Sequence, residues 1–475
     1  MIYKTAWKNV WRNRTRSLVV ITSITIGIFA GVFAVGLMNG TIEQRVDAAL
    51  NQEMAHIQVN REQFRENFEI NLTINNADSV SKLILRNEDV TGVAQRLLVN
   101  AIANTASKSV GIQLNGIDPE AEKKILSLDK TLIPGTGSYF EDPGRHNLAY
   151  IGQDLAKDLN IIRFSLDEAA IDSLASGGIP PETLSKLDIL VNKQFPGEKA
   201  FSKEVQAALS RTEVKKYGAD IMKRAWHFRD RSKITMTFLD KNLMQTGAMF
   251  RIAGIYDVNN SVFEKSQVFI LRTDLERLTG IDANSCHQIL VKVNDRDEAL
   301  PLAKKLRTEM PGLQVESWKE ISPDLAMMVL MVQKFNGVFL LIILAALSFG
   351  IVNTMLMVVL ERTKELGMLT AIGMNKRRVF SMIMAESVFL SLVGGVAGMV
   401  ISRLFIISVA SKGISISSVS EGFEAMGFSS HIYPSISGTF FITVTILIII
   451  TGILSAIYPA IKALKLDPAD ALRTE

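Results

Sequence analysis

The sequence is 475 residues long, carries a formal charge of +4 and is 48% hydrophobic. Its mean hydropathy of +0.22 exceeds that of ordinary soluble globular chains, so the composition favours a membrane protein. Most of the basic excess lies beside apolar stretches, so it does not indicate a nucleic-acid partner. The single cysteine, Cys286, has no partner within the chain for a disulfide, so we expect its domain to fold by its core alone.

The N-terminal residues 1–17 combine aromatic and basic side chains. Tyr3, Trp7, Val10 and Trp11 recur at helical spacing with Lys and Arg between them. This pattern predicts an amphipathic helix that lies in the membrane interface. Residues 18–38 then form an apolar run long enough to be a first membrane span. The run is too long for the apolar region of a cleavable signal peptide, and no cleavage pattern follows it.

Residues 39–334 are mostly polar and predict one large mixed α/β domain between the first and second spans. Alternating apolar and polar residues predict strands, and 3.6-residue periodicity predicts helices between them. The predicted strands are 56–60, 110–118, 233–240, 250–257 and 287–294, and the predicted helices are 78–85, 120–128, 153–159 and 299–310. Residues 162–231 are richer in charge and contain "GGIPP", which indicates an inserted subdomain.

Three further apolar runs predict spans two to four. These spans are 335–360, 379–409 and 439–458; segments 361–378 and 410–438 connect them, and 459–475 forms the tail. Residues 324–334 contain no Gly or Pro, so we expect one helix over 324–360, about 55 Å long. Because a bilayer core is about 30 Å thick, part of this helix would project as a stalk. Residues 42–50 extend the first span in the same way.

Basic residues beside the spans predict the orientation. They cluster before span one, in segment 361–378 and after span four, whereas segment 410–438 has only Lys412 against Glu421 and Glu424. We therefore expect both termini and segment 361–378 in the cytoplasm and the large domain outside. The predicted fold class is a membrane protein of four transmembrane helices, with a large α/β (α+β) domain inserted between helices 1 and 2.

No catalytic or metal-binding motif is recognisable in the sequence. It has no phosphate-binding loop, no H-E-x-x-H and no G-x-S-x-G, and its five histidines lack metal-ligand spacing. We therefore expect no catalytic residues, no metal and no cofactor on this chain. Any work that it performs would need energy from a partner.

Several residues inside or beside the spans suggest specific contacts. The pairs Gly27/Gly31 and Gly394/Gly398 are small-xxx-small motifs, which allow helix backbones to approach closely. Glu386 lies within span three, where a carboxylate is costly. It could snorkel, pair with the charged segment before the span, or serve a proton pathway. No second acid or histidine in the spans would complete such a pathway, which favours the structural pair.

Met327, Met328 and Met331 cluster at the outer end of span two. Methionine suits surfaces that accept varied apolar ligands, and the alternative is that these side chains simply face lipid.

The stretch "ERTKELGMLTAIGM" (361–374) predicts a short amphipathic helix between two spans. Leu366, Leu369 and Gly373 recur at i, i+3 and i+7, and the charged residues Glu361, Lys364 and Glu365 occupy the preceding turn. Such a helix could lie on the membrane or bind in a groove of a cytoplasmic protein.

The block "ERTKELGMLTAIGMNKRRVFSMIMAESVFLSLVGGVAG" (361–398) resembles the signature of ABC transporter permeases of the MacB/FtsX/LolC-LolE family. The opening "AWKNVWRNRTRSLVVITSITIGI" and the closing "YPAIKALKLDPADALRTE" are similar to that family's ends. "NGIDPEAEKKI" and "IGQDLAKDL" resemble parts of its periplasmic core domain. The resemblance implies a non-catalytic, dimeric permease in the bacterial inner membrane, with ATP and Mg bound by a separate cytoplasmic ABC ATPase.

In this family the segment between spans two and three is a coupling helix that docks on the ATPase. The resemblance implies that ATP hydrolysis is transmitted to the periplasmic domain as movement. Carried over by matching motif, the contact residues would be Glu361, Arg362, Glu365, Leu366, Gly367, Ala371 and Gly373.

Three functions are compatible with the resemblance. The first is release of lipoproteins from the inner membrane, with a periplasmic chaperone or adaptor as a further partner and the Met-rich stalk as an apolar contact. The second is MacB-type efflux of amphiphiles or peptides, and the third is FtsX-type regulation of a cell-wall hydrolase. The extra residues 162–231 depart from the family pattern and leave the substrate open. The sequence also leaves open whether the second permease is another copy or a paralogue.

Overall fold

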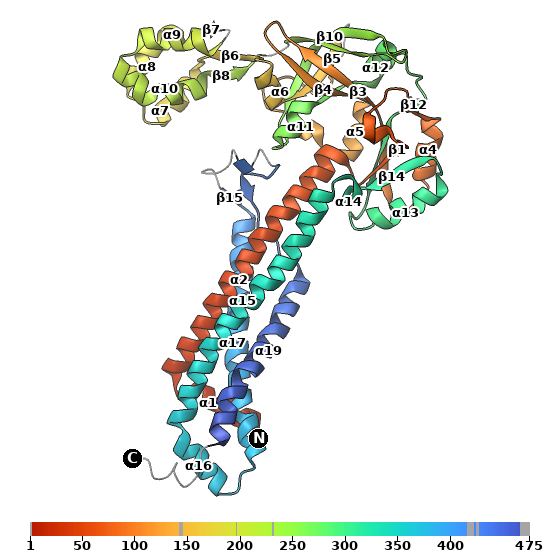
Figure 1. Ribbon diagram of the computed structural model, residues 1–475. Helices are drawn as coiled ribbons and strands as arrows, with labels where there is room; N and C mark the ends of the chain where they lie inside the picture. Colours follow the sequence, from red (N-terminus) through yellow and green to blue (C-terminus); the bar gives the residue numbers. More distant parts are fainter. Residues whose placement is uncertain are drawn as a thin grey trace. The chain divides into compact units, whose positions relative to one another are not determined.

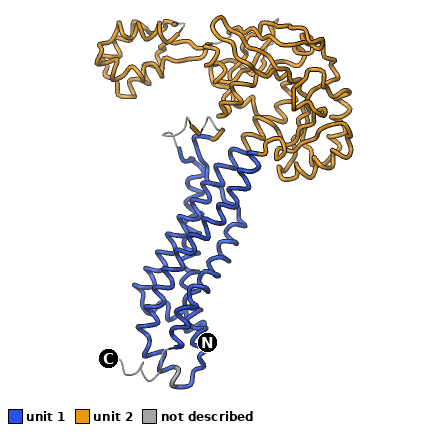
Figure 2. The backbone as a smooth tube through the Cα atoms, in the orientation of Figure 1, with its two compact units in different colours: residues 1–46, 324–420, 429–475 blue, residues 47–323, 421–428 orange. Residues whose placement is uncertain are grey.

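The computed structural model describes residues 2–141, 146–195, 197–229, 232–415, 422–423 and 427–465, without the side chains of Ile2, Thr370 and Ala371. Glu421, Glu424 and the tail beyond residue 465, which entered the sequence predictions, lie outside this description. The chain divides into two compact units (Figure 2). Unit 1 comprises residues 1–46, 324–420 and 429–475, and unit 2 comprises 47–323 and 421–428.

Unit 1 consists of long apolar helices that run side by side (Figure 1). They are α2 (Arg14–Ala48), α15 (Pro323–Glu361), α17 (Lys376–Ala410) and α19 (Gly438–Leu464). Each is long and apolar enough to cross a membrane. The α/β domain lies between the first and second of them in sequence, so the predicted fold class is confirmed. The 39 residues of α15 agree with the single long helix expected over 324–360.

The glycine pairs of the spans lie at helix–helix contacts. A Cβ on Gly27 would come within 2.8 Å of Leu347, and one on Gly398 within 2.8 Å of the Thr25 carbonyl oxygen. A Cβ on Gly31 would come within 2.9 Å of Ile343, and one on Gly394 within 2.8 Å of Ile24. Glycine therefore lets α2 approach α15 on one side and α17 on another, as small-xxx-small pairs do in membranes.

Polar side chains add ties between the same helices. Asn336 of α15 donates to Asn39 of α2 at 2.6 Å, and the Thr25 hydroxyl of α2 donates to the Gly394 carbonyl at 3.1 Å. A short ladder, β15 (Ile414–Ser415) with β16 (His431–Ile432), joins α17 to the segment before α19. Each hydrogen bond of a polar side chain between membrane helices contributes at most about 1–2 kcal/mol to their association.

The predicted interfacial helix is shorter than residues 1–17. Helix α1 spans Ile2–Arg12, and α2 already begins at Arg14. Ala6 and Val10 are buried in the core of unit 1, whereas Tyr3, Trp7 and Trp11 remain largely exposed. Trp7 contacts Phe389 of α17 edge-on at 5.5 Å between ring centres. Helix α1 therefore buries Ala6 and Val10 in the core of unit 1 and also contacts α17 through the ring of Trp7.

Unit 2 is built on a nine-stranded mixed sheet of order β14-β1-β13-β3-β4-β11-β5-β10-β9. An additional β3–β9 pairing closes β3, β4, β11, β5, β10 and β9 into a ring. The parallel pairs are β10–β5 and β11–β4. The strands are β1 (Ile57–Arg61), β3 (Val90–Asn104), β4 (Ser109–Ile117), β5 (Asn147–Gly152), β9 (Lys233–Leu239), β10 (Gln245–Tyr256), β11 (Gln267–Leu271), β13 (Gln288–Val293) and β14 (Leu313–Ser317).

The remaining elements of unit 2 cover this sheet or connect its strands. The 15 residues of β3 pair first with β13 and then with β4, so one strand joins two parts of the sheet. The other elements are η1 (Ala49–Met54), α3 (Phe64–Asn67), β2 (Ile74–Asn75), α4 (Ala77–Ile84), α5 (Pro119–Ile125), η2 (Leu128–Thr131), α6 (Gln153–Asp158), α11 (Ser261–Ser266), α12 (Arg272–Thr279), β12 (Ser285–Cys286), α13 (Ala299–Glu309) and α14 (Trp318–Ile321).

The segment predicted as an insertion folds around an apolar core of its own. Its largest buried side chains include Phe164 and Phe201, which stack at 5.5 Å between ring centres. A Ser210–Glu213 capping box begins its longest helix. Its elements are β6 (Ile162–Ser165), α7 (Glu168–Ser176), α8 (Pro181–Leu187), η3 (Asp188–Leu190), β7 (Gln194–Phe195), α9 (Glu198–Ala208), α10 (Arg211–Ala225) and β8 (Trp226–Phe228).

Candidate functional site

The charged segment between spans two and three folds into a nine-residue helix, α16 (Thr363–Ala371). Glu365 lies in its first turn, where an acidic side chain complements the helix dipole. Gly373 ends the turn after the helix with φ +95°, and the amide of Met374 donates back to the Leu369 carbonyl at 3.0 Å. Asn375 then caps α17 through the Arg377 amide at 2.9 Å.

Two opposite faces of α16 have different surroundings. Leu366 is 4% exposed and belongs to the core of unit 1, and Leu369 packs against the same core. Met368 is 51% exposed, and Ile372, directly after the helix, is 78% exposed. Lys364 completes this exposed face at i, i+4 and i+8. We call Lys364, Met368 and Ile372 the outer face of α16.

The structure shows where the residues of the predicted helical face lie. The sequence placed Leu366, Leu369 and Gly373 on one face of a short helix, but only the first two lie on the helix, where they point into the core, and Gly373 follows its end. Gly367 is also buried, and the side chain of Ala371 lies outside the description. The exposure of Met368 and Ile372 was not predicted, because a buried and an exposed apolar stripe look alike in sequence. Only the packing of α16 against the other helices of unit 1 shows which of its apolar side chains are buried and which are exposed.

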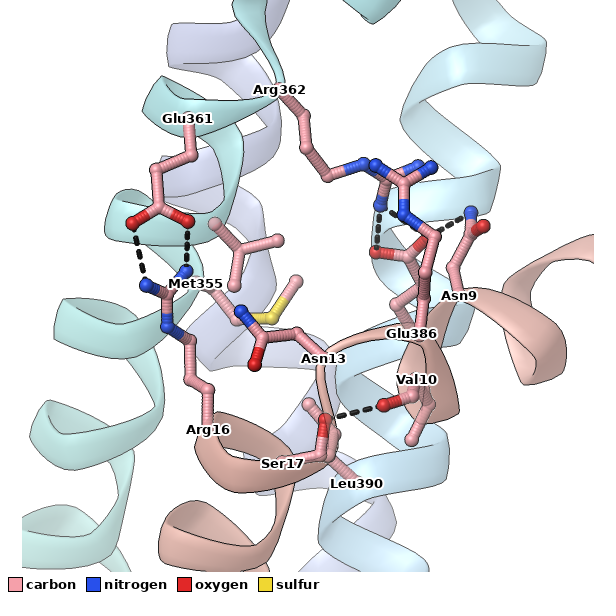
Figure 3. Close-up of a pocket in the computed structure, with 12 residues that line it drawn as sticks. Asn9, Val10, Asn13, Arg16, Ser17, Met355, Glu361, Arg362, Glu386 and Leu390 are labelled. Atoms are coloured by element: carbon pink, nitrogen blue, oxygen red, sulfur yellow. Dashed lines mark hydrogen bonds and ion pairs between the residues drawn. The ribbon is translucent and has the colours of Figure 1, made fainter.

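Glu386 of α17 is the most buried acid beside α16, at 4% exposed. Arg362, in the link between α15 and α16, donates to both of its carboxylate oxygens, at 3.1 and 3.2 Å. Asn9 of α1 donates to the same carboxylate at 2.6 Å (Figure 3). The structure thus places Glu386 against the charged segment, which is the structural pair that the sequence favoured over a proton pathway.

Two more acids extend these contacts to the N-terminal helices. Glu365 accepts from Arg12 of α1 and, at 3.1 Å, from Nε of Arg362. Glu361, at the end of α15, forms an ion pair with Arg16 of α2 through both carboxylate oxygens (Figure 3). The hydrogen bond from Arg12 lowers the pKa of Glu365 below its usual value, so this acid stays ionised near neutral pH.

Three arginines and three glutamates therefore balance in one cluster, which we call the charged cluster. It links α1, α2, α15, α16 and α17, and its members are Asn9, Arg12, Arg16, Glu361, Arg362, Glu365 and Glu386. Six of these residues, all except Glu365, line a pocket of about 320 Å³ with Val10, Asn13, Ser17, Met355, Val358 and Leu390 (Figure 3).

The cluster is suited to holding helices together. Each carboxylate forms an ion pair with an arginine, so none is a free base. The attraction between opposite charges offsets the cost of removing the buried ones from water. Across residues 2–141, 146–195, 197–229, 232–415, 422–423 and 427–465, no three His, Cys, Asp or Glu side chains gather as metal ligands would. Glu365 joins α16 directly to Arg12 of α1, and Arg362 joins Glu365 to Glu386 of α17, through charge-assisted hydrogen bonds.

The methionines of the predicted stalk lie in the first turns of α15. Met327 is 55% exposed and Met331 is 61% exposed, with Leu330 at 58% between them. Met328 is half-buried. The exposed side chains recur at i, i+3 and i+4 and so share one face of the helix. This part of α15 therefore presents an apolar stripe.

Comparison with known proteins shows which proteins this chain resembles. Residues 337–468 match the model "FtsX-like permease C-terminal". Over 255 residues, half of the chain, the sequence is 26% identical to the "Uncharacterized ABC transporter permease YvrN" of Bacillus subtilis and covers 58% of it. Over 235 residues, 48% of the chain, it is 20% identical to the "Lipoprotein-releasing system transmembrane protein LolC" of Xylella fastidiosa and covers 55% of that protein.

A third relative matches over a shorter segment. The "Macrolide export ATP-binding/permease protein MacB" of Chlorobium luteolum is 36% identical over 126 residues, which are 26% of this chain and 16% of that one. The extracellular domain of YknZ, a solved structure, covers 55% of the chain at 12% identity with a TM-score of 0.28, too distant to add to the sequence matches. The chain spans little more than half of YvrN and LolC. It carries an FtsX-like permease domain over residues 337–468, which confirms its resemblance to the MacB, FtsX and LolC type of ABC permease.

Proposed function

We propose that this chain is the permease subunit of an ABC transporter and that a separate cytoplasmic ATPase docks on the outer face of α16. The observation that carries the proposal is the exposure of Met368 and Ile372 on a short helix between two spans. Large apolar side chains beside charged ones are typical of a docking surface. In the proposed orientation, the basic flanks keep this face in the cytoplasm.

The charged cluster then transmits the movement of the ATPase into the spans. Arg362 is bonded to Glu365 of α16 and Glu386 of α17, so a displacement of α16 pulls on α17 through one guanidinium. Arg12 and Arg16 connect the same region to α1 and α2. Helices α2 and α15 both continue beyond the roughly 20 residues that a bilayer requires. This length supports transmission of movement to the large domain.

We propose lipoproteins as the substrate, released from the inner membrane. The apolar stripe of Met327, Leu330 and Met331 supports this assignment, because a lipid-modified protein offers acyl chains to a flexible, apolar surface. The name of the relative LolC points in the same direction. A second permease subunit and a periplasmic acceptor complete the proposed system, and ATP with Mg binds to the ATPase alone.

The docking proposal is tested by measuring ATP hydrolysis in the complex that copurifies with the full chain from membranes. Met368→Asp and Ile372→Asp should each lower the copurified ATPase activity at least tenfold, because a carboxylate in an apolar contact costs more than 1.4 kcal/mol. Ile189→Asp, an exposed apolar residue elsewhere in the chain, is the matched control. If both outer-face variants copurify with as much ATPase and as much activity as the wild type, the proposal that the ATPase docks on this face is refuted.

The substrate is tested separately by depleting the chain in cells. Lipoproteins should then accumulate in the inner membrane, and a Met331→Asp chain should fail to relieve that accumulation. Normal lipoprotein sorting together with altered tolerance to amphiphiles would replace this substrate with those of an efflux permease. Normal sorting with chained cells would instead indicate regulation of a cell-wall hydrolase.

A further inference from the structure

A second site lies at the other end of α17, away from α16. A groove of about 460 Å³ runs between α17 and α19. Each helix contributes four residues at i, i+3, i+4 and i+7, so one face of each helix forms a wall. The walls are Val396, Met399, Val400 and Arg403 from α17, and Gly438, Phe441, Ile442 and Thr445 from α19.

The apolar lining of this groove is open. Val396 is 48% exposed, Val400 is 51% exposed and Ile442 is 63% exposed. A Cβ on Gly438 would meet no atom within 4 Å, so the end of the groove at the start of α19 is also unobstructed. These surfaces remain available to an acyl chain from the surrounding bilayer.

Arg403 is the one charged residue of the groove lining, and it is exposed. Within the described part of the chain it forms neither a hydrogen bond nor an ion pair. The guanidinium of Arg403 is therefore available to an anionic partner outside the described chain.

The position of Arg403 along α17 indicates which anion is within reach. Arg378 is the last basic residue before the apolar run, and 20 helical residues from it span about 30 Å, the thickness of the hydrocarbon core. Gly398 lies at that distance, and Arg403 lies five residues, about 7.5 Å, beyond it. This is the depth of the headgroups in the opposite leaflet, whereas Val396 and Val400 lie nearer to the acyl chains.

We infer that this groove binds one phospholipid of the leaflet opposite α16, with its phosphate on Arg403 and an acyl chain along Val396, Val400 and Ile442. The guanidinium presents a planar fork of donors that fits two phosphate oxygens. The apolar walls exclude water from one side of this contact, which strengthens it. The inference requires only that α17 and α19 span the membrane and does not depend on the ATPase or on the transported substrate.

Native mass spectrometry of the full chain in maltoside micelles, with added phosphatidylglycerol, tests this site. The wild-type chain should retain one phosphatidylglycerol, and Arg403→Ala should weaken that binding at least tenfold. Arg403→Lys, which keeps the charge but loses the fork, should fall between the two. Lys412→Ala removes an exposed charge shortly after the same helix and should retain the lipid as the wild type does.

A groove-filling variant separates binding from folding. Val400→Trp keeps Arg403 but obstructs the acyl path, and because Val400 is half exposed the helix should still fold. This variant should lose the lipid while eluting as the wild type on size exclusion. A diacylglycerol without phosphate should bind at least tenfold more weakly than phosphatidylglycerol.

Three results would overturn the inference. Equal lipid retention by wild type, Arg403→Ala and Val400→Trp would remove the site. Displacement of the lipid by millimolar inorganic phosphate would show that free phosphate, and not a lipid, is the ligand. Loss of a dimer in Arg403→Ala, without any change in bound lipid, would assign the groove to contact with a second copy of the chain.

Discussion

The charged side chains near the two ends of α17 differ in burial and in whether they have a hydrogen-bonding partner. Near α16, Glu386 is 4% exposed and accepts hydrogen bonds from Arg362 and Asn9. Near the far end, Arg403 is exposed and has no partner within the described residues. The first charge is neutralised inside the protein and serves to hold helices together. The second is left for a ligand, so the presence or absence of a partner distinguishes a structural charge from a binding charge along one helix.

The largest predicted effect concerns the buried pair. Arg362→Ala leaves Glu386 without its main cation and should lower the free energy of unfolding by about 3–5 kcal/mol, as breaking a buried ion pair does. Thermal unfolding of the full chain in micelles measures this loss. Arg377→Ala, at an exposed position on α17, the helix of Glu386, is the control. The double variant Arg362→Met/Glu386→Leu should recover much of the loss, and failure to do so would contradict the pairing.

A buried histidine, His287, gives a third case, in which the side chain stays neutral. His287 is fully buried; its Nδ1 accepts from the Leu98 amide at 3.0 Å and its Nε2 donates to the Ile70 carbonyl at 2.8 Å. Burial lowers the pKa of His287 to about 4, and burial together with Lys292 and Arg296 lowers that of His56 to about 4 as well.

These lowered values predict a loss of stability in acid. The unfolded chain binds a proton below about pH 6.5, while folded His287 does not until about pH 4, so stability is full above pH 6.5 and falls between these values. Each histidine should contribute about 1.4 kcal/mol per pH unit in that range. Chemical unfolding of unit 2 within the full chain, followed from pH 7 to 4, measures the slope. His287→Gln should reduce it, with His146→Gln as control, and an unchanged slope would reject the assignment.

A change in the close contact between α2 and α17 should have a smaller effect on stability. A Cβ on Gly398 would come within 2.8 Å of the Thr25 carbonyl oxygen, which the backbone of α2 holds in place. Gly398→Ala should therefore cost about 1–3 kcal/mol of stability, as overpacking does. Gly350→Ala is the matched control, because nothing lies within 4 Å of its Cβ position. Equal unfolding temperatures of the two variants would mean that α2 and α17 are not in close contact.

The exposed pair between α1 and α16 should affect stability least. Arg12 and Glu365 are 57% and 41% exposed, so solvent screens their attraction. Arg12→Ala should change the free energy of unfolding by only about 0.2–1 kcal/mol. A loss above about 2 kcal/mol in the same thermal assay would show that this pair is structural in the manner of Arg362 and Glu386.

Much of the fold follows from local patterns in the sequence. The predicted strand 233–240 and helix 153–159 match β9 and α6 within one residue, because half-buried strands alternate and amphipathic helices repeat. Strand β5 was missed because Leu148–Gly152 are all buried, so its sequence does not alternate. Strand β3 was missed because different parts of it pair with different neighbours.

The site was harder to predict than the fold. The partners Arg12 and Glu365 are 353 residues apart, and no local pattern connects them. Gly373 was placed on a helix that in fact ends two residues earlier. Arg403 resembles any polar residue near the end of a span until the structure shows that its neighbours leave it unpaired. Partner choice across helices depends on tertiary packing, which periodicity does not encode.

The most direct test of the central claim is a charge swap between α1 and α16, measured as ATP hydrolysis of the copurified complex. If the charged cluster transmits movement from α16 into the spans, Arg12→Glu and Glu365→Arg should each lower the activity severalfold while the chain stays folded. The double variant Arg12→Glu/Glu365→Arg restores opposite charges between α1 and α16 but loses the contact of Glu365 with Arg362, so it should regain part of the activity. Wild-type activity in both single variants, or no recovery in the double variant, would contradict transmission through this pair.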